Sequence, residues 1–150
     1  YRTAGFHIHI GYNMDKDNPY TRKEFNKIIT RAFDMFVVIP SMFKYVDKRR
    51  FENYGGLGQY RHTKYGVECR SLGAYYVDEK YLPWVIEQTC RALSFVKSYS
   101  NCDALLNLSK PIVKFLDNDE FTFDSSIYED LEINLHDQLI NEKTKTYVNS

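Results

Sequence analysis

The segment from Tyr54 to Leu72 constrains this chain more than any other part of the sequence. Its nineteen residues include glycines at 55, 56, 58 and 66, two arginines, one lysine and a single carboxylate, Glu68. A segment that only fills a core does not need that mixture, because buried polar groups have to be paired. The mixture is typical of a surface that holds an anionic ligand and a metal. Residues 59–61 and 66–72 are predicted to be two strands joined by a short turn.

A second polar cluster lies near the N-terminus, in a strand predicted over Ala4–Tyr12. His7 and His9 share one face of this strand, because alternate side chains of a strand point the same way. The two imidazoles are expected about 7 Å apart along the strand. One can ligate a divalent metal while the other donates to a phosphate or a carboxylate. The alternative interpretation is that one histidine is exposed and has no function.

The same alternation places Glu68 and Arg70 on one face of the strand over 66–72. An ordinary ion pair is the simplest interpretation, and such pairs contribute little to stability at a surface. The functional interpretation is that Glu68 is a hard oxygen ligand for Mg²⁺ and that Arg70 is a fork for a substrate carboxylate. We predict that this pair and the two histidines converge on one exposed face of the sheet.

Further cations flank this pair, with Arg61 on the neighbouring strand and Arg49-Arg50 in the preceding loop. Nucleotide phosphates need several positive groups, because negative charge accumulates on the oxygens of the transferred phosphoryl group. The glycines at 55, 56 and 58 let the backbone approach a ligand closely, or they form a plain turn. They are not a Walker loop, since no Gly-Lys-Ser/Thr follows them.

The remaining pattern predicts an α+β fold, with a mostly antiparallel sheet and helices packed on one face. A helix is predicted to begin at Thr21, where Glu24 completes a capping box. Pro40 is predicted to interrupt this helix, because proline lacks the N–H that an α-helix uses. A further helical turn over 41–46 and a charged loop over 47–58 are expected to follow.

The C-terminal half is predicted to be mainly helical. A long helix is expected from Glu79 or Lys80 to Tyr99. Its apolar residues recur at helical spacing, and the predicted buried face includes Val85, Ile86, Cys90, Leu93 and Val96. Shorter elements are expected to follow, namely helical pieces over 102–108 and 111–116, an acidic loop over 117–124 and a helix over 126–139.

Composition sets the outer bounds of function. A chain of 150 residues fits a single domain, and a formal net charge of zero gives no global attraction to nucleic acid or anionic membranes. No apolar run reaches the roughly 20 residues that span a bilayer. The three cysteines lack metal-type spacing, which favours a reduced, cytoplasmic setting. The chain begins at Tyr1 with a strand close behind, so we expect residues 1–150 to be the C-terminal part of a larger domain.

Together the two clusters resemble a known family, the phage-type carboxylate–amine ligases (amidoligase type 2) of the glutamine synthetase and γ-glutamylcysteine ligase superfamily. The resemblance spans about residues 1–85. It rests on the run over residues 2–11, on Arg49-Arg50 and on Tyr54-Gly-x-x-Gly-x-Tyr-Arg61-x-x-Lys64-Tyr-Gly-Val-Glu68-x-Arg70. The specific parts of the resemblance are the patterns Tyr54-Gly-x-x-Gly-x-Tyr-Arg61 and Gly66-Val-Glu68-x-Arg70. Phe6 departs from the family, because it stands where a glycine is expected.

The resemblance implies an ATP-dependent ligase that joins a small-molecule or peptide carboxylate to an amine through an acyl phosphate, on a glutamine synthetase-like catalytic half. It implies a phage or prophage origin and hence a host cytoplasm. It implies site roles as well. His7 and Glu68 would ligate Mg²⁺, and His9 would contact a phosphate. Arg50 and Arg61 would stabilise the transferring phosphoryl group, Arg70 would orient the substrate carboxylate, and Lys64 is a further phosphate candidate.

Two other classes stay open at this stage. His-hydrophobic-His is also the metal signature of rolling-circle nucleases, which pair it with a nucleophilic tyrosine in Tyr-x-x-Lys, and Tyr20-Thr-Arg-Lys23 has that form. In those enzymes the tyrosine lies well downstream, whereas Tyr20 stands at a helix start, and neutral charge does not favour DNA. The other class is a non-catalytic module that keeps the ligase fold.

Overall fold

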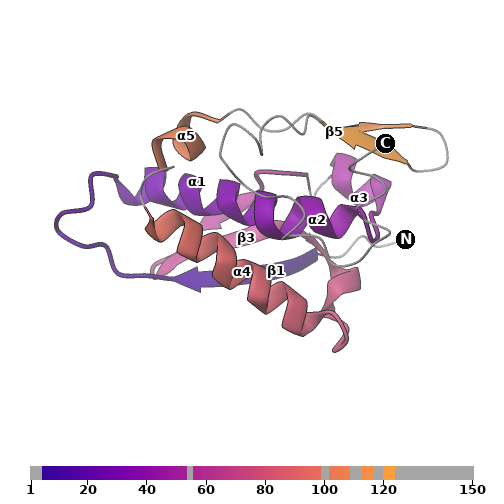
Figure 1. The fold of residues 1–150 in the computed structure, drawn as a ribbon, viewed down its shortest axis with the longest axis horizontal. Helices are drawn as coiled ribbons and strands as arrows, with labels where there is room; N and C mark the ends of the chain where they lie inside the picture. The colour runs from indigo at the N-terminus through magenta and orange to yellow at the C-terminus, as the bar shows by residue number, and fades with distance from the viewer. Residues whose placement is uncertain (1–4, 54–55, 99–101, 109–112, 117–119, 124–150) are drawn as a thin grey trace.

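The computed structural model describes residues 5–53, 56–98, 102–108, 113–116 and 120–123. Its main sheet has three antiparallel strands in the order β1 (Gly5–Gly11), β3 (Gly66–Gly73) and β2 (Tyr60–His62). Helices cover one face of this sheet (Figure 1). This arrangement confirms the predicted α+β class and the three predicted strands. The core lies between sheet and helices, where Val67, Cys69 and Leu72 of β3 and Ile28, Ile29 and Phe33 are all buried.

The pairing of β1 with β3 contains one irregularity that matters for the site. Opposite His7 on β1, β3 places two residues, Arg70 and Ser71, while the register is regular on both sides of them. This is a β-bulge, which redirects the side chains around it. At the other end of the pair only glycine fits at Gly66, because a Cβ there would lie 2.0 Å from the carbonyl oxygen of Ile10.

The first helix, α1 (Arg22–Phe33), begins where the sequence predicts. Thr21 is its N-cap, and the capping box with Glu24 is complete. The prediction that Pro40 interrupts the helix is wrong, because the chain stays helical through a π-helical segment, η1 (Asp34–Val38), into α2 (Ile39–Met42). The ring of a proline clashes with a carbonyl one α-helical turn earlier, and a wider π turn relieves that clash.

The chain between α2 and the sheet also differs from the prediction. The helix ends at Met42, so the predicted helical turn over 41–46 is mostly wrong. A short helix, α3 (Lys48–Asn53), forms where a loop was predicted. The side chain of Asp47 explains it, because its Oδ1 accepts the backbone N–H groups of Arg49 and Arg50 at 3.1 and 3.3 Å. Such a cap stabilises the first turn of a helix.

A 3₁₀ turn, η2 (Ala74–Val77), leads from β3 towards α4 (Leu82–Lys97), which confirms the predicted long helix. The predicted buried face of α4 is partly wrong. Its buried residues are Val85, Gln88, Ala92 and Val96, which form one narrow stripe, whereas Ile86 is 56% exposed and Cys90 is exposed. The stripe is narrow because α4 packs along α1 and η1 and makes its main contacts there.

The last described elements are the helix α5 (Cys102–Asn107) and a separate antiparallel hairpin of β4 (Val113–Phe115) and β5 (Phe121–Phe123). Helix α5 confirms its prediction. The strand β4 lies where a helix was predicted over 111–116, and the strand β5 lies where an acidic loop was predicted over 117–124, so both predictions are wrong. The hairpin forms because its aromatic residues pack on Phe43. The helix predicted over 126–139 lies outside the described residues. None of the described helices is long and apolar enough to cross a membrane.

Candidate active site

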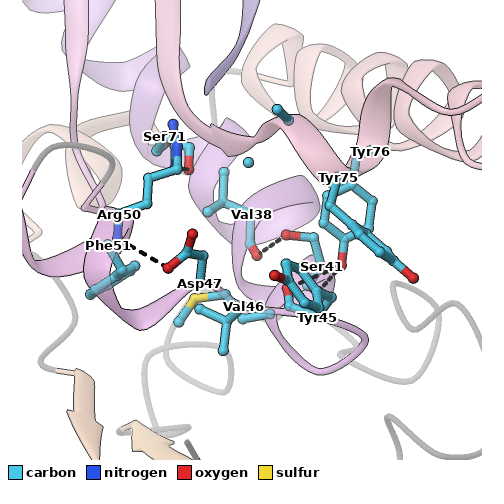
Figure 2. Close-up of a pocket in the computed structure, with 13 residues that line it drawn as sticks. Val38, Ser41, Tyr45, Val46, Asp47, Arg50, Phe51, Ser71, Tyr75 and Tyr76 are labelled. Carbon is cyan, nitrogen blue, oxygen red and sulfur yellow. Dashed lines mark hydrogen bonds between the residues drawn. The ribbon is translucent and has the colours of Figure 1, made fainter. Parts of the chain in front are cut away.

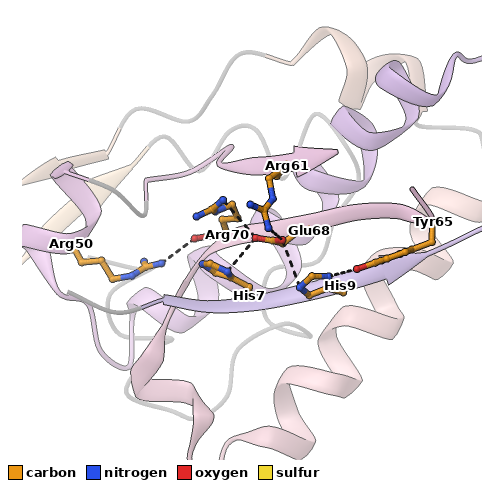
Figure 3. Close-up of polar contacts among 7 residues, drawn as sticks. All are labelled: His7, His9, Arg50, Arg61, Tyr65, Glu68 and Arg70. Atoms are coloured by element: carbon orange, nitrogen blue, oxygen red, sulfur yellow. Dashed lines mark hydrogen bonds and ion pairs between the residues drawn. The ribbon is translucent and has the colours of Figure 1, made fainter. Parts of the chain in front are cut away.

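The predicted site is organised around Glu68, which lies in the middle of the central strand. The register places His9 of β1 and Arg61 of β2 directly opposite Glu68, on its two sides. Directly opposite side chains share one face of a sheet, so the three form a row across the strands. His7 and Arg70 join the same cluster from β1 and β3 (Figure 3). The four side chains predicted to converge therefore do lie together, and Arg61 lies with them.

The other side chains of the cluster surround the carboxylate of Glu68, the one carboxylate that the described residues contribute to the cluster. Arg61 Nη2 donates to Glu68 Oε2 at 2.6 Å, and His9 Nε2 lies 3.6 Å from the same oxygen. His7 Nδ1 and Arg70 Nη1 lie 3.1 and 3.6 Å from Oε1. These neighbours leave the side chain of Glu68 only 1% exposed, although it projects from the face that the helices do not cover. The predicted position on an exposed face is thus correct for the cluster and wrong for Glu68 itself.

The charge state of Glu68 follows from these contacts. Burial alone would raise the pKa of its carboxyl group, but the hydrogen bond and the charge of Arg61 outweigh burial and hold the pKa below the ordinary value of 4.5. The charges of His7 and Arg70 act in the same direction. Glu68 is therefore ionised at neutral pH, and it holds the cations of the cluster in place.

His7 has the opposite tendency. Burial, and then the charge of Arg70, lower the pKa of its imidazole below the ordinary 6.5, against the opposing effect of Glu68. Arg50 and Arg61 add to the lowering. At neutral pH the ring is therefore uncharged and keeps one nitrogen lone pair, which is the form that ligates metals. His9 is held differently, because its Nδ1 pairs with the hydroxyl of Tyr65 at 2.7 Å.

Arg50 is buried beside the cluster and bonds to the backbone of β3. Its Nη1 donates to the carbonyl oxygen of Ser71 at 3.1 Å, and its Nη2 donates to that of Arg70 at 2.9 Å. Both acceptors belong to the bulge. A Cβ on Gly5 would lie 2.6 Å from Arg50 Nη2 and 3.3 Å from His7 Nε2, so the guanidinium and the imidazole meet at a place that only a glycine leaves open.

Lys64 lies apart from the cluster, on the turn between β2 and β3. Its side chain borders an open depression together with Gly11–Met14, Arg22 and Tyr65. Arg22 Nη2 fixes this turn by donating to the carbonyl oxygens of Thr63 and Lys64, at 3.3 and 3.0 Å. Among the described residues, no hydrogen bond or ion pair links the Lys64 ammonium group to the Glu68 cluster. Its predicted contact with a phosphate stays a prediction.

Two polar residues support the sheet from the helical side, and sequence reasoning missed both. Asp34 Oδ1 accepts from the hydroxyl of Ser71 at 2.8 Å, and Oδ2 accepts from the backbone N–H of Gly58 at 2.7 Å. Gly58 has a φ of 79°, so it forms a turn that only glycine adopts easily. The glycine loop therefore acts here as a turn, and the available sequence signal was an aspartate within an apolar helical stripe.

Asn26 is the second residue of this kind. Its Nδ2 donates to the carbonyl oxygen of Gly66 at 3.0 Å and contacts His62 Nδ1 at 2.7 Å, while its Oδ1 accepts from the hydroxyl of Tyr12. One buried amide thus joins α1 to the start of β3, to β2 and to the segment after β1. An asparagine in the middle of a predicted helix, where it is a weak helix former, was the available signal.

The nuclease alternative depends on Tyr20, and the structure does not favour it. The hydroxyl of Tyr20 donates to Asp103 Oδ1 at 2.5 Å, and this hydrogen bond raises the pKa of the phenol to about 12. A nucleophilic tyrosine needs the opposite, a phenol that loses its proton readily. Tyr20 instead ties the loop before α1 to α5.

The geometry agrees with what a comparison of the sequence shows. A family model described as "Phage phiEco32-like COOH.NH2 ligase-type 2" matches residues 2–116. The matched range includes every residue of the Glu68 cluster, the turn with Lys64 and all the described helices. No curated protein and no solved structure matches the chain. On the strength of a match over most of its length, the chain belongs to the phage phiEco32-like COOH–NH2 ligases of type 2.

Proposed function

We propose that this protein forms amide bonds from a carboxylate and an amine at the expense of ATP, with Mg²⁺, in the cytoplasm of a phage host, and that its sheet is half of a glutamine synthetase-like site. The observation that supports this proposal is the Glu68 cluster, which consists of Glu68, His7, His9, Arg61 and Arg70, with Arg50 beside it. The described residues bring three guanidinium groups, from Arg50, Arg61 and Arg70, to one carboxylate and two imidazoles. Such a surplus of positive groups complements phosphate and carboxylate ligands.

The proposed reaction has two steps. The substrate carboxylate attacks the γ-phosphorus of ATP, and the bond between that phosphorus and the β–γ bridging oxygen breaks. ADP departs as the leaving group, and the substrate becomes an acyl phosphate. The amine then attacks the acyl carbon, the bond to the phosphate oxygen breaks, and the amide forms as the amine gives up a proton to solvent. Both steps place negative charge on phosphoryl oxygens, and fixed cations lower the barrier by stabilising that charge.

The side chains divide this work by position. Arg61 is the most exposed member of the cluster, at 63%, and it faces an incoming phosphoryl group from the edge strand. Arg70, at 25%, stands next to His7 and orients the substrate carboxylate as a planar fork. Arg50 supplies positive charge from beneath, and His9 contacts a phosphate. Lys64 reaches the nucleotide from the neighbouring turn.

The residues fit a metal that arrives with its nucleotide. Glu68 Oε1 is buried and accepts no hydrogen bond from the described residues, although His7 Nδ1 and Arg70 Nη1 lie 3.1 and 3.6 Å away, so it is the oxygen that a cation would use. His7 supplies an uncharged nitrogen beside it. No three histidine, cysteine, aspartate or glutamate side chains in the described part of the chain form a metal site by themselves. Mg²⁺ commonly takes one or two protein ligands and completes its shell with phosphates and water. Bound Mg²⁺ would neutralise phosphate charge.

Because the sheet supplies only half of the proposed site, the test is ADP release by the complete protein in the presence of ATP, Mg²⁺ and a panel of carboxylates and amines drawn from amino acids and short peptides. We expect Glu68→Gln to lower turnover by at least about 100-fold, because it removes both the metal ligand and the charge that positions the cations. The matched control is Glu87→Gln, which makes the same chemical change in an exposed ion pair with Arg91 on α4.

Three results would contradict the proposal. One is full turnover by a folded Glu68→Gln variant, with circular dichroism used to establish folding. Another is the absence of Mg·ATP binding by the folded wild-type protein, which would identify a non-catalytic module. The third is metal-dependent cleavage of single-stranded DNA that Tyr20→Phe abolishes, which would restore the nuclease alternative.

A further inference from the structure

A cavity of about 270 Å³ is bordered by Arg50, which lies beside the Glu68 cluster, and it has no role in the steps described so far. It lies between α2, α3, η2 and the last residues of β3, and apolar and aromatic side chains make up most of its wall. Figure 2 shows Arg50 and Ser71 on one side of the cavity and Tyr45 and Tyr75 on the other. One end of the cavity therefore belongs to the residues that support the site.

The aromatic side is built from rings that the fold does not bury. Tyr45 and Tyr75 stack with their ring centroids 4.3 Å apart and their planes at 20°, yet they are 47% and 42% exposed. Behind them Tyr76 is fixed, because its hydroxyl donates to the carbonyl oxygens of Ser41 and Tyr45. The pair thus offers a rigid apolar wall, and flat rings of this kind bind other rings and aliphatic groups.

Gly73 borders the cavity without a side chain. Its backbone angles, φ −77° and ψ 151°, suit any residue, so the conformation does not require glycine. A Cβ at Gly73 would meet no heavy atom of the described residues within 4 Å. Glycine at the end of a strand costs conformational entropy. Neither the backbone nor a described neighbour demands a glycine, and the missing side chain leaves open space at the cavity wall.

The space at Gly73 opens towards the site. Gly73 pairs directly with Gly5, and opposite residues project from the same face of a sheet. A Cβ at Gly5 would touch Arg50 and lie 3.3 Å from His7 Nε2. A group above Gly73 therefore lies on the face that carries the Glu68 cluster, next to its innermost cation.

Size and charge select the kind of occupant. An apolar cavity of about 150 Å³ already holds benzene, so 270 Å³ suits one ring or a branched aliphatic group and is too small for a nucleotide. Asp47 also borders the cavity, but its Oδ1 accepts two backbone N–H groups as the cap of α3. The predominantly apolar wall therefore favours an apolar group.

We propose that this cavity holds the aromatic or large aliphatic side chain of the carboxylate substrate, with the carboxylate group at the Arg50 end beside His7. The inference rests on the proposed ligase function and narrows it to one substrate class, amino acids or peptides whose reacting residue carries a large apolar side chain. Small or charged carboxylates would leave the tyrosine wall uncovered.

Binding can be measured without the reaction. Ligand-observed NMR, with neither ATP nor Mg²⁺ present, compares N-acetyl-phenylalanine with N-acetyl-alanine, which lacks the ring, and with N-acetyl-phenylalanine amide, which lacks the charge. We expect N-acetyl-phenylalanine to bind at least about tenfold more tightly than N-acetyl-alanine, because filling an apolar pocket typically discriminates by about 10- to 200-fold. We also expect it to bind more tightly than the amide, because the amide has no carboxylate charge for Arg50.

Variants locate the binding. Gly73→Leu fills the open space and should weaken the binding of N-acetyl-phenylalanine by at least about tenfold. Gly73→Ala adds less volume and should weaken the binding less. Tyr75→Ala removes part of the aromatic wall at an exposed position and tests the same cavity if Gly73→Leu does not fold. Tyr75→Phe is the matched control, since it keeps the ring and loses only the contact of its hydroxyl with Tyr81.

The outcomes separate this inference from the ligase function. Equal binding of the phenylalanine and alanine derivatives, or binding that Gly73→Leu and Tyr75→Ala leave unchanged, would overturn the cavity assignment, even if ADP release with some other carboxylate supported a ligase. Ring-dependent binding that these variants abolish, without ADP release by the complete protein from any substrate pair, would support the cavity and overturn the ligase.

Discussion

The carboxylate of Asp34 accepts a hydrogen bond from the hydroxyl of Ser71 at 2.8 Å, from the helical side of the sheet. Its second oxygen accepts the backbone N–H of Gly58 at 2.7 Å. One side chain at the start of the π-helical segment therefore fixes both the bulge of β3 and the turn that precedes β2. The positions of Arg70 and Arg61 depend on these two backbone segments.

We expect Asp34→Asn to destabilise the protein by about 1–3 kcal/mol, because an amide NH₂ would then face one of two donors inside the core. Urea unfolding followed by circular dichroism measures the change. Asp78→Asn is the control, since among the described residues the Oδ1 of this exposed aspartate accepts the local backbone N–H of Lys80 and no distant donor. An Asp34→Asn variant as stable as the control would show that the buried network contributes nothing.

Asn26 offers a graded test of the link between α1 and the sheet. Asn26→Ala removes the bonds to Gly66, His62 and Tyr12 and leaves buried groups without partners, so we expect a loss of about 2–3 kcal/mol. Tyr12→Phe removes one of these bonds and should cost about 1 kcal/mol. Thermal and urea unfolding give both values, and a larger loss for Tyr12→Phe than for Asn26→Ala would contradict this account.

Arg61→Gln should affect stability and activity to different extents. Arg61 is 63% exposed, but its partner Glu68 is only 1% exposed, and the variant leaves that carboxylate without its closest cation, so we expect a loss of about 1–3 kcal/mol in urea unfolding. Under the proposed function its kcat/KM should fall by about 100-fold or more. Arg91→Gln, in the exposed pair with Glu87, is the matched control for both measurements. Unchanged kcat/KM in Arg61→Gln would remove Arg61 from the reaction.

The stability of the fold should depend on pH in two stages. The pKa of His7 is lowered below 6.5 in the folded protein, so as the pH falls below 6.5 the unfolded chain binds a proton that the folded protein does not, and stability decreases. The pKa of Glu68 is lowered below 4.5, so its contribution is complete above 4.5 and is lost as the pH falls through the lowered value.

Urea unfolding at about pH 7.5, 6, 5 and 4 would resolve these stages. His7→Asn should remove the first decrease and keep the second, because the asparagine side chain does not titrate. Glu68→Gln should make the decrease below 4.5 smaller, while Glu24, whose pKa is also lowered by its hydrogen bonds with Thr21, still contributes to it. A stability that stays constant from neutral pH down to pH 4.5 in the wild type would refute the assignment to His7.

The sequence predicted the strands of the site well, because residue alternation is a local property that tertiary packing rarely reverses. Glu68 and Arg70 could be placed on one face with the histidines from this rule alone. The direct row of His9, Glu68 and Arg61 could not be foreseen in detail, since the register of β1 against β3 arises from pairing between segments more than fifty residues apart.

The errors have equally physical origins. Pro40 reads as a helix breaker, and nothing local shows that a π turn will accommodate it. The strand β4 was wrongly predicted as a helix. Three residues are too few to show the alternation of a strand in the sequence, and β4 forms because it pairs with β5. The role of Asp34 was invisible for a related reason, since both of its donors lie more than twenty residues away in sequence.

The bulge of β3 has a consequence for comparing this chain with others. Between Cys69 and Leu72, which both face the core, β3 supplies an outward guanidinium at Arg70 and a hydroxyl at Ser71 that bonds to Asp34. A regular ladder has room for only one residue at that point. Deleting one residue there should therefore be more harmful than substituting either, and alignments of relatives should treat the spacing from Glu68 to Leu72 as fixed.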